Sequence, residues 1–72
     1  MWYLRIFWDD VKARRLFRPE VEMIALMDAK TEDDAIKSAE SYVRGMHPGF
    51  VEALQEVQVL HVSAIHTIRY DA

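Results

Sequence analysis

Three stretches of the chain carry apolar residues in the pattern of β-strands. Residues 2–8 read Trp-Tyr-Leu-Arg-Ile-Phe-Trp, a run of the aromatic and branched side chains that favour strands. Residues 20–28 form a second such run. Residues 57–70 alternate imperfectly, because the parity of the apolar positions slips around Ser63. This slip predicts either a bulged strand or two short strands.

The segment from residue 31 to residue 46 has the pattern of an amphipathic helix. Its apolar residues recur every three or four positions in one stripe: Ala35, Ile36, Ala39, Tyr42, Val43 and Met46. Thr31 suits the N-cap, where its hydroxyl accepts a hydrogen bond from the first turn, and Asp34 can complete a capping box. Gly45 is predicted to end the helix in the left-handed conformation. Since this helix starts three residues after a strand ends at Asp28, the fold class is α+β.

These elements give the order ββαβ in a single domain, residues 1–72. A right-handed crossover from the second strand to the third places the third strand beyond the first. The sheet is then small and antiparallel, with the spatial order 2-1-3 and one helix packed on one face. Residues 9–19 form a long connection between the first two strands, and residues 47–49 form a turn.

The feature that bears most on function is a sheet face without a helix. A helix of about 14 residues covers only one side of such a sheet, yet both parities of the first two strands are apolar. We assign Tyr3, Phe7, Ile24 and Leu26 to the uncovered face, although parity alone leaves open which set faces the helix. Such a face predicts an interface in a homodimer or with a target protein, and we expect a homodimer that acts by steric occupation of a macromolecular partner. The alternatives are that residues 9–19 fold over it, or that a small protein simply exposes some apolar area.

The composition is that of a small folded domain. The chain has 72 residues, 51% of them hydrophobic, a net charge of −3 and no cysteine, so disulfides and thiolate metal sites are excluded. A domain of this size has a small core and often gains burial by association. No stretch approaches the roughly 18 apolar residues of a membrane span, and residues 1–8 read as a strand rather than a signal peptide. We therefore expect a cytoplasmic protein with no membrane partner.

A group of four cations lies between residues 12 and 18. They are Lys12, Arg14, Arg15 and Arg18, with Leu16 and Phe17 among them. We predict that this basic loop binds the partner together with the helix-free face. Cations with an interleaved aromatic residue can also contact phosphates and stack on bases, so the alternative function is a nucleic-acid-binding regulator. The other interpretation is a solvated loop whose cations pair with the acidic start of the helix. The acidic balance of the whole chain favours this second interpretation.

No catalytic, metal-binding or cofactor-binding residues are predicted. The acids Glu32, Asp33 and Asp34 are explained by the start of the helix, where negative charge is favoured. His61 and His66 are five residues apart, so on one regular strand they would point to opposite faces and could not share a metal ion. Nucleophile-type and glycine-rich phosphate motifs are also missing from the sequence. We expect a non-enzymatic protein.

The stretch from Asp28 to Ala39 resembles a pattern found in small proteins of phages and other mobile elements. In these proteins a strand of a short hairpin ends, and a helix opens with a Thr or Ser cap, acids and alanines at helical spacing. In size and layout the chain is similar to several anti-CRISPR proteins and related phage inhibitors of host systems. The resemblance implies a non-enzymatic inhibitor that occludes the surface of a host protein in the host cytoplasm. It assigns no role to an individual residue.

Overall fold

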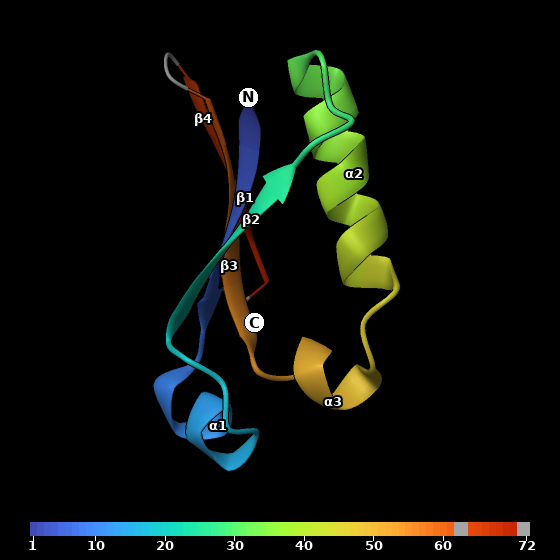
Figure 1. Ribbon diagram of the computed structural model, residues 1–72. Helices are drawn as coiled ribbons and strands as arrows, with labels where there is room; N and C mark the ends of the chain where they lie inside the picture. The colour runs from blue at the N-terminus through green and yellow to red at the C-terminus, as the bar shows by residue number, and fades with distance from the viewer. Residues whose placement is uncertain (62–63, 71–72) are drawn as a thin grey trace.

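The computed structural model describes residues 1–61 and 64–70. These residues form three helices and four strands. In chain order these are β1 (Trp2–Trp8), α1 (Asp10–Arg15), β2 (Val21–Leu26), α2 (Glu32–Arg44), α3 (Pro48–Val51), β3 (Leu54–His61) and β4 (Ala64–Arg69). Figure 1 shows the strands as one sheet with α2 alongside it. None of the helices in this part of the chain is long and apolar enough to cross a membrane.

The sheet has four strands in the order β2-β1-β3-β4, and each neighbouring pair is antiparallel. The predicted α+β class, the antiparallel pairing and the placement of β1 between β2 and β3 are confirmed. The layout differs in detail, because β3 and β4 are two strands where ββαβ has one, and two short helices, α1 and α3, accompany α2. The helix-side residues of β3 have odd numbers, such as Val57 and Val59, and those of β4 have even numbers, such as His66 and Ile68. This change of parity between the two strands accounts for the slip in the pattern. Ser63, where the slip was placed, lies outside the described residues.

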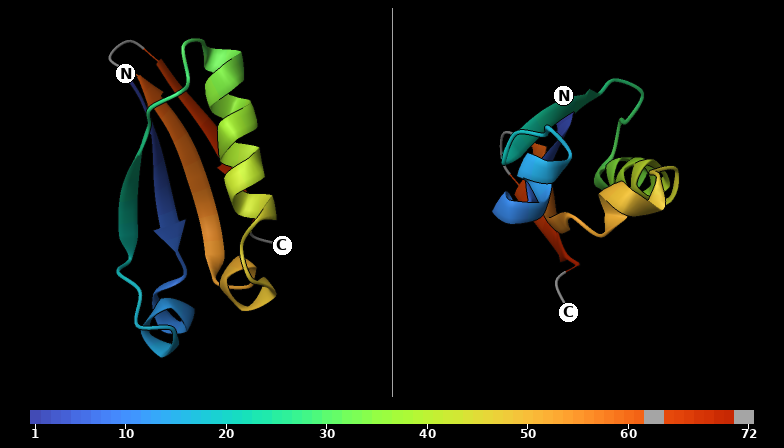
Figure 2. Two further views of the ribbon diagram at one scale, coloured as in Figure 1. Left: turned by 45° about the vertical axis from the view of Figure 1, so that its right-hand side comes forward. Right: turned by 90° about the horizontal axis from the view of Figure 1, so that it is seen from below.

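One face of the sheet is covered by helices and forms the core. Figure 2 shows α2 and α3 on the same side of the sheet. The buried side chains of β1 are Trp2, Leu4, Ile6 and Trp8, and those of α2 are Ala35, Ala39 and Val43. Two small alanines at the contact let the helix lie close to the central strands, where Val57 and Val59 of β3 complete the packing.

The start of α2 is as predicted and its end is not. Thr31 is the N-cap, and its hydroxyl accepts a hydrogen bond from the Asp34 N–H at 3.1 Å. The Asp34 carboxylate accepts from the Lys30 N–H at 3.4 Å, one residue before the donor of a standard capping box. Gly45 has a φ of −79°, so the left-handed prediction was wrong. The Met46 N–H instead bonds to the Val43 carbonyl at 3.1 Å, and this tighter turn closes the helix without a left-handed residue.

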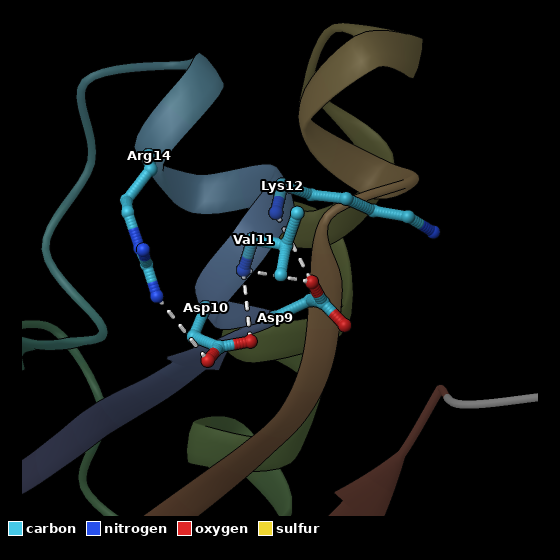
Figure 3. A network of polar contacts seen from close by, with 5 residues as sticks. All are labelled: Asp9, Asp10, Val11, Lys12 and Arg14. Carbon is cyan, nitrogen blue, oxygen red and sulfur yellow. Dashed lines mark hydrogen bonds and ion pairs between the residues drawn. The ribbon is translucent and has the colours of Figure 1, made fainter.

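The connection at residues 9–19 contains a short helix, α1, over Asp10–Arg15. Asp9 caps α1, and its carboxylate accepts hydrogen bonds from the backbone N–H groups of Val11 and Lys12 (Figure 3). Only Ala13 of α1 is buried. In Figures 1 and 2 α1 lies beyond the end of the sheet, so this segment does not fold over the helix-free face. The predicted turn at residues 47–49 is likewise the beginning of a helical turn, α3, capped by His47.

Candidate functional site

The helix-free side of the sheet is a regular array of twelve side chains, which we call the open face. In an antiparallel pair, residues directly opposite each other share a face, so the strand registers divide these side chains into three rows across β2, β1, β3 and β4. The Tyr3 row is Ala25, Tyr3, Leu60 and Ile65. The Arg5 row is Met23, Arg5, Gln58 and Thr67. The Phe7 row is Val21, Phe7, Glu56 and Arg69.

The Tyr3 row is apolar from one edge of the sheet to the other. Ile65 is 63% exposed and Tyr3 is 38% exposed, while Leu60 between them is buried by its neighbours. On the adjoining row Met23 is 57% exposed. A shallow depression of about 470 Å³ lies here, lined by Met1, Tyr3, Arg5, Met23, Leu60 and His61. This end of the open face is a wide apolar surface in contact with water.

A chain of polar contacts crosses the open face from β1 to β4. The Arg5 guanidinium donates to Gln58 Oε1 at 3.1 Å, and Gln58 Nε2 donates to Glu56 Oε2 at 3.2 Å. Glu56 Oε1 in turn lies 3.4 Å from Arg69 Nε. The Arg5 guanidinium also lies 5.8 Å from the centre of the Phe7 ring, within the range of a cation–π contact. The charged groups of the open face are therefore engaged with one another, beside apolar side chains.

The structure corrects the predicted membership of this face. Tyr3 and Phe7 lie on it as predicted, but Ile24 and Leu26 do not. Ile24 is opposite Leu4 and Leu26 is opposite Trp2, and both pack against the core on the helix side. Val21, Met23 and Ala25 of β2 take their place. Because β2 is apolar on both parities, its sequence alone does not distinguish the two registers.

Sequence reasoning also missed a carboxylate on the helix side of β2. Glu22 Oε1 accepts a hydrogen bond from the indole N–H of Trp8 at 3.1 Å, and lies 3.4 Å from Arg18 Nη1. The Arg18 guanidinium lies 4.7 Å from the centre of the Phe50 ring. The available signal in the sequence is that Glu22 is the one charged residue of an otherwise apolar strand. This cluster joins the end of the sheet to α3 and explains the position of Arg18.

The predicted basic segment forms α1 and the turn after it. Arg14 Nη2 lies 3.6 Å from Asp10 Oδ2 (Figure 3), and Lys12 Nζ donates to the Glu52 carbonyl at 3.2 Å. With Arg18 bound to Glu22, three of its four cations have partners within the chain, and Arg15 is exposed. Phe17 is 96% exposed and has a φ of +55°, a left-handed conformation that is unusual for an aromatic residue.

The histidines lie differently from the prediction. His61 is on β3 and stacks on Trp2, with ring centres 4.7 Å apart, and His66 on β4 is opposite Val59. Both side chains therefore lie on the helix side of the sheet. The prediction of opposite faces applied to one regular strand, whereas the two histidines lie on the two strands of a hairpin. Among the described residues, no group of three or more His, Asp or Glu side chains could hold a metal ion.

Comparison of the chain with protein-family models, with curated proteins and with solved structures finds no match.

Proposed function

We propose that this chain is a non-enzymatic, cytoplasmic binding protein that covers the surface of a protein partner with its open face. The observation that carries this proposal is the apolar Tyr3 row, with Met23 beside it, exposed on a sheet face that α2 and α3 leave uncovered. Aromatic residues, methionine and arginine are enriched in protein interfaces, and the open face contains Tyr3, Phe7, Met23 and Arg5.

The arrangement of polar groups supports a protein partner in particular. Since Arg5 donates to Gln58 and Glu56 lies against Arg69, a partner can cover these groups without breaking the contacts that they make with each other. An inhibitor that acts by occlusion, as the resemblance to phage proteins implies, would use this same face. Its mechanism would be steric and would require only that the open face bind tightly enough to exclude another ligand of the partner.

Site-specific photo-crosslinking tests this proposal. A benzophenone amino acid replaces Met23 on the open face or, as a matched control, Tyr42 on α2, which is 42% exposed. We expect a discrete protein adduct at position 23 and no such adduct at position 42. Equal adducts at both positions, or none at position 23, would overturn the proposal.

Nucleic-acid binding by residues 12–18 is the alternative, and the exposure of Phe17 beside Arg15 is the observation that favours it. A single-stranded base could stack on that ring while Arg15 contacts a phosphate. This alternative predicts binding to oligonucleotides with a steep salt dependence that flattens when Arg14 and Arg15 become Ala. Binding that is undetectable at low salt would exclude it.

A further inference from the structure

We infer that the partner of the open face is a second copy of this chain, stacked sheet to sheet about a twofold axis that runs along the strands between β1 and β3. This inference rests on the proposed function, because it names the occupant of the same surface. Three properties of the open face lead to it: its size, its row of apolar residues, and the positions of its charges.

The size of the open face sets the strength of the contact. Four strands about 4.8 Å apart and six residues long, at about 3.3 Å each, give a face of roughly 19 by 20 Å. Two copies together then bury on the order of 800–1,200 Å², at or below the lower limit of standard interfaces. We therefore expect a reversible dimer with a dissociation constant in the micromolar range.

Two simple twofold arrangements place one open face on another. With the axis along the strands, β1 lies over the partner's β3, and each row lies over the same row of the second copy. With the axis across the strands, each strand lies over its own copy and the Tyr3 row lies over the Phe7 row. In both cases the packed sheets are about 10 Å apart.

The charges of the open face distinguish these arrangements. With the axis across the strands, Arg5 faces Arg5 of the second copy, and Leu60 faces Glu56. Like charges in contact are unfavourable, so the Arg5 contact counts against this arrangement. With the axis along the strands, Arg5 faces Gln58 of the second copy, a group to which it can donate a hydrogen bond. No two like charges of the open face are then opposite each other, and Glu56 and Arg69 face Phe7 and Val21 of the second copy.

The apolar Tyr3 row is complementary to itself in the arrangement with the axis along the strands. With the axis along the strands, Tyr3 faces Leu60 of the second copy and Ala25 faces Ile65, so the apolar Tyr3 row is covered by itself. Leu60, already buried within one copy, then lies at the centre of a continuous apolar layer. A row complementary to itself supplies the apolar contact of an isologous dimer.

Sedimentation equilibrium tests whether the dimer forms. Over a range from about 1 μM to 1 mM, which spans the dissociation constants expected for an interface of this size, the unmodified chain should pass from monomer to dimer. Met23→Lys and Ile65→Lys should each weaken dimerisation by about tenfold or more, while Tyr42→Lys on α2 leaves it unchanged. Circular dichroism confirms that each variant is folded. A chain that stays monomeric at 1 mM, or a dimer that Met23→Lys and Ile65→Lys leave intact, would overturn the inference.

Cysteine crosslinking tests the arrangement, since the native chain has no cysteine. With the axis along the strands, residue 23 of one copy faces residue 67 of the other. A short bis-maleimide that spans about 10 Å should therefore join a Met23→Cys chain to a Thr67→Cys chain and should join neither variant to itself. Self-crosslinking of either variant alone would refute this axis.

The outcomes separate this inference from the proposed function. A chain that is monomeric at 1 mM but yields a specific adduct with a different protein from position 23 refutes the second copy and supports the binding function. A dimer with the predicted crosslinks supports the second copy as the occupant of the open face. A monomer with no adduct at position 23 refutes both.

Discussion

The hydrogen bond between Trp8 and Glu22 provides a direct test of how the end of the sheet is held together. Trp8 is 4% exposed, and its indole N–H donates to Glu22 Oε1 at 3.1 Å. Replacing Glu22 with Ala leaves this donor without its partner in a partly buried site. Leaving a buried donor unsatisfied costs about 1–3 kcal/mol. The ion pair with Arg18, partly open to water at 39% and 20% side-chain exposure, adds about 1 kcal/mol or less.

We therefore expect Glu22→Ala to lower the free energy of unfolding by about 2 kcal/mol. For a domain of this size that is a fall in Tm of roughly 8–16 °C. Glu22→Gln keeps an oxygen that can accept from the indole and loses only the charge, so its destabilisation should be below about 1 kcal/mol. Urea unfolding followed by circular dichroism measures both values.

A double-mutant cycle assigns the effect to the hydrogen bond. Trp8→Phe removes the donor, so Glu22→Ala should destabilise the Trp8→Phe background by about 1 kcal/mol less than it destabilises the native chain. Exchange of the Trp8 indole proton, followed by NMR, should also be faster in Glu22→Ala. A loss below about 0.5 kcal/mol in Glu22→Ala, or a coupling of zero in the cycle, would contradict this explanation.

Three further predictions concern other parts of the fold. Thr31→Ala removes the hydroxyl that caps α2 and should destabilise the chain by about 1 kcal/mol, whereas Thr31→Ser should be nearly neutral; thermal unfolding measures both. Phe17→Gly should stabilise the chain by about 1 kcal/mol because it relieves the positive φ of a side chain that is 96% exposed, and Phe17→Ala, which keeps the unfavourable backbone, should show no such gain in the same assay. Leu4→Ala, at a fully buried position, should cost about 2–5 kcal/mol in urea unfolding, and a cost below about 1 kcal/mol would contradict its place in the core.

Much of the candidate site follows from the sequence, but its membership does not. Tyr3 and Phe7 were assigned to the helix-free face because one helix cannot cover two apolar faces. Ile24 and Leu26 were assigned wrongly, because β2 is apolar on both parities and a shift of one residue exchanges its two faces. Its one charged residue, Glu22, points toward the helix side, where Trp8 and Arg18 bind its carboxylate. Only the pairing of Tyr3 with Ala25 identifies the β2 residues that are exposed.

The sequence by itself determined the features whose forces act between residues close in the chain. The start of α2, its apolar stripe and the strand character of residues 2–8 depend on capping, on helical spacing and on local preference. The tertiary structure decided the register of β2 on β1, the division of residues 57–70 into two strands and the pairing of the α1 cations with acids and carbonyls. These depend on contacts between distant residues, and several arrangements satisfy the local pattern equally well. The tertiary structure therefore also decided which residues make up the open face, because the register of a strand depends on pairing between residues that are distant in the chain.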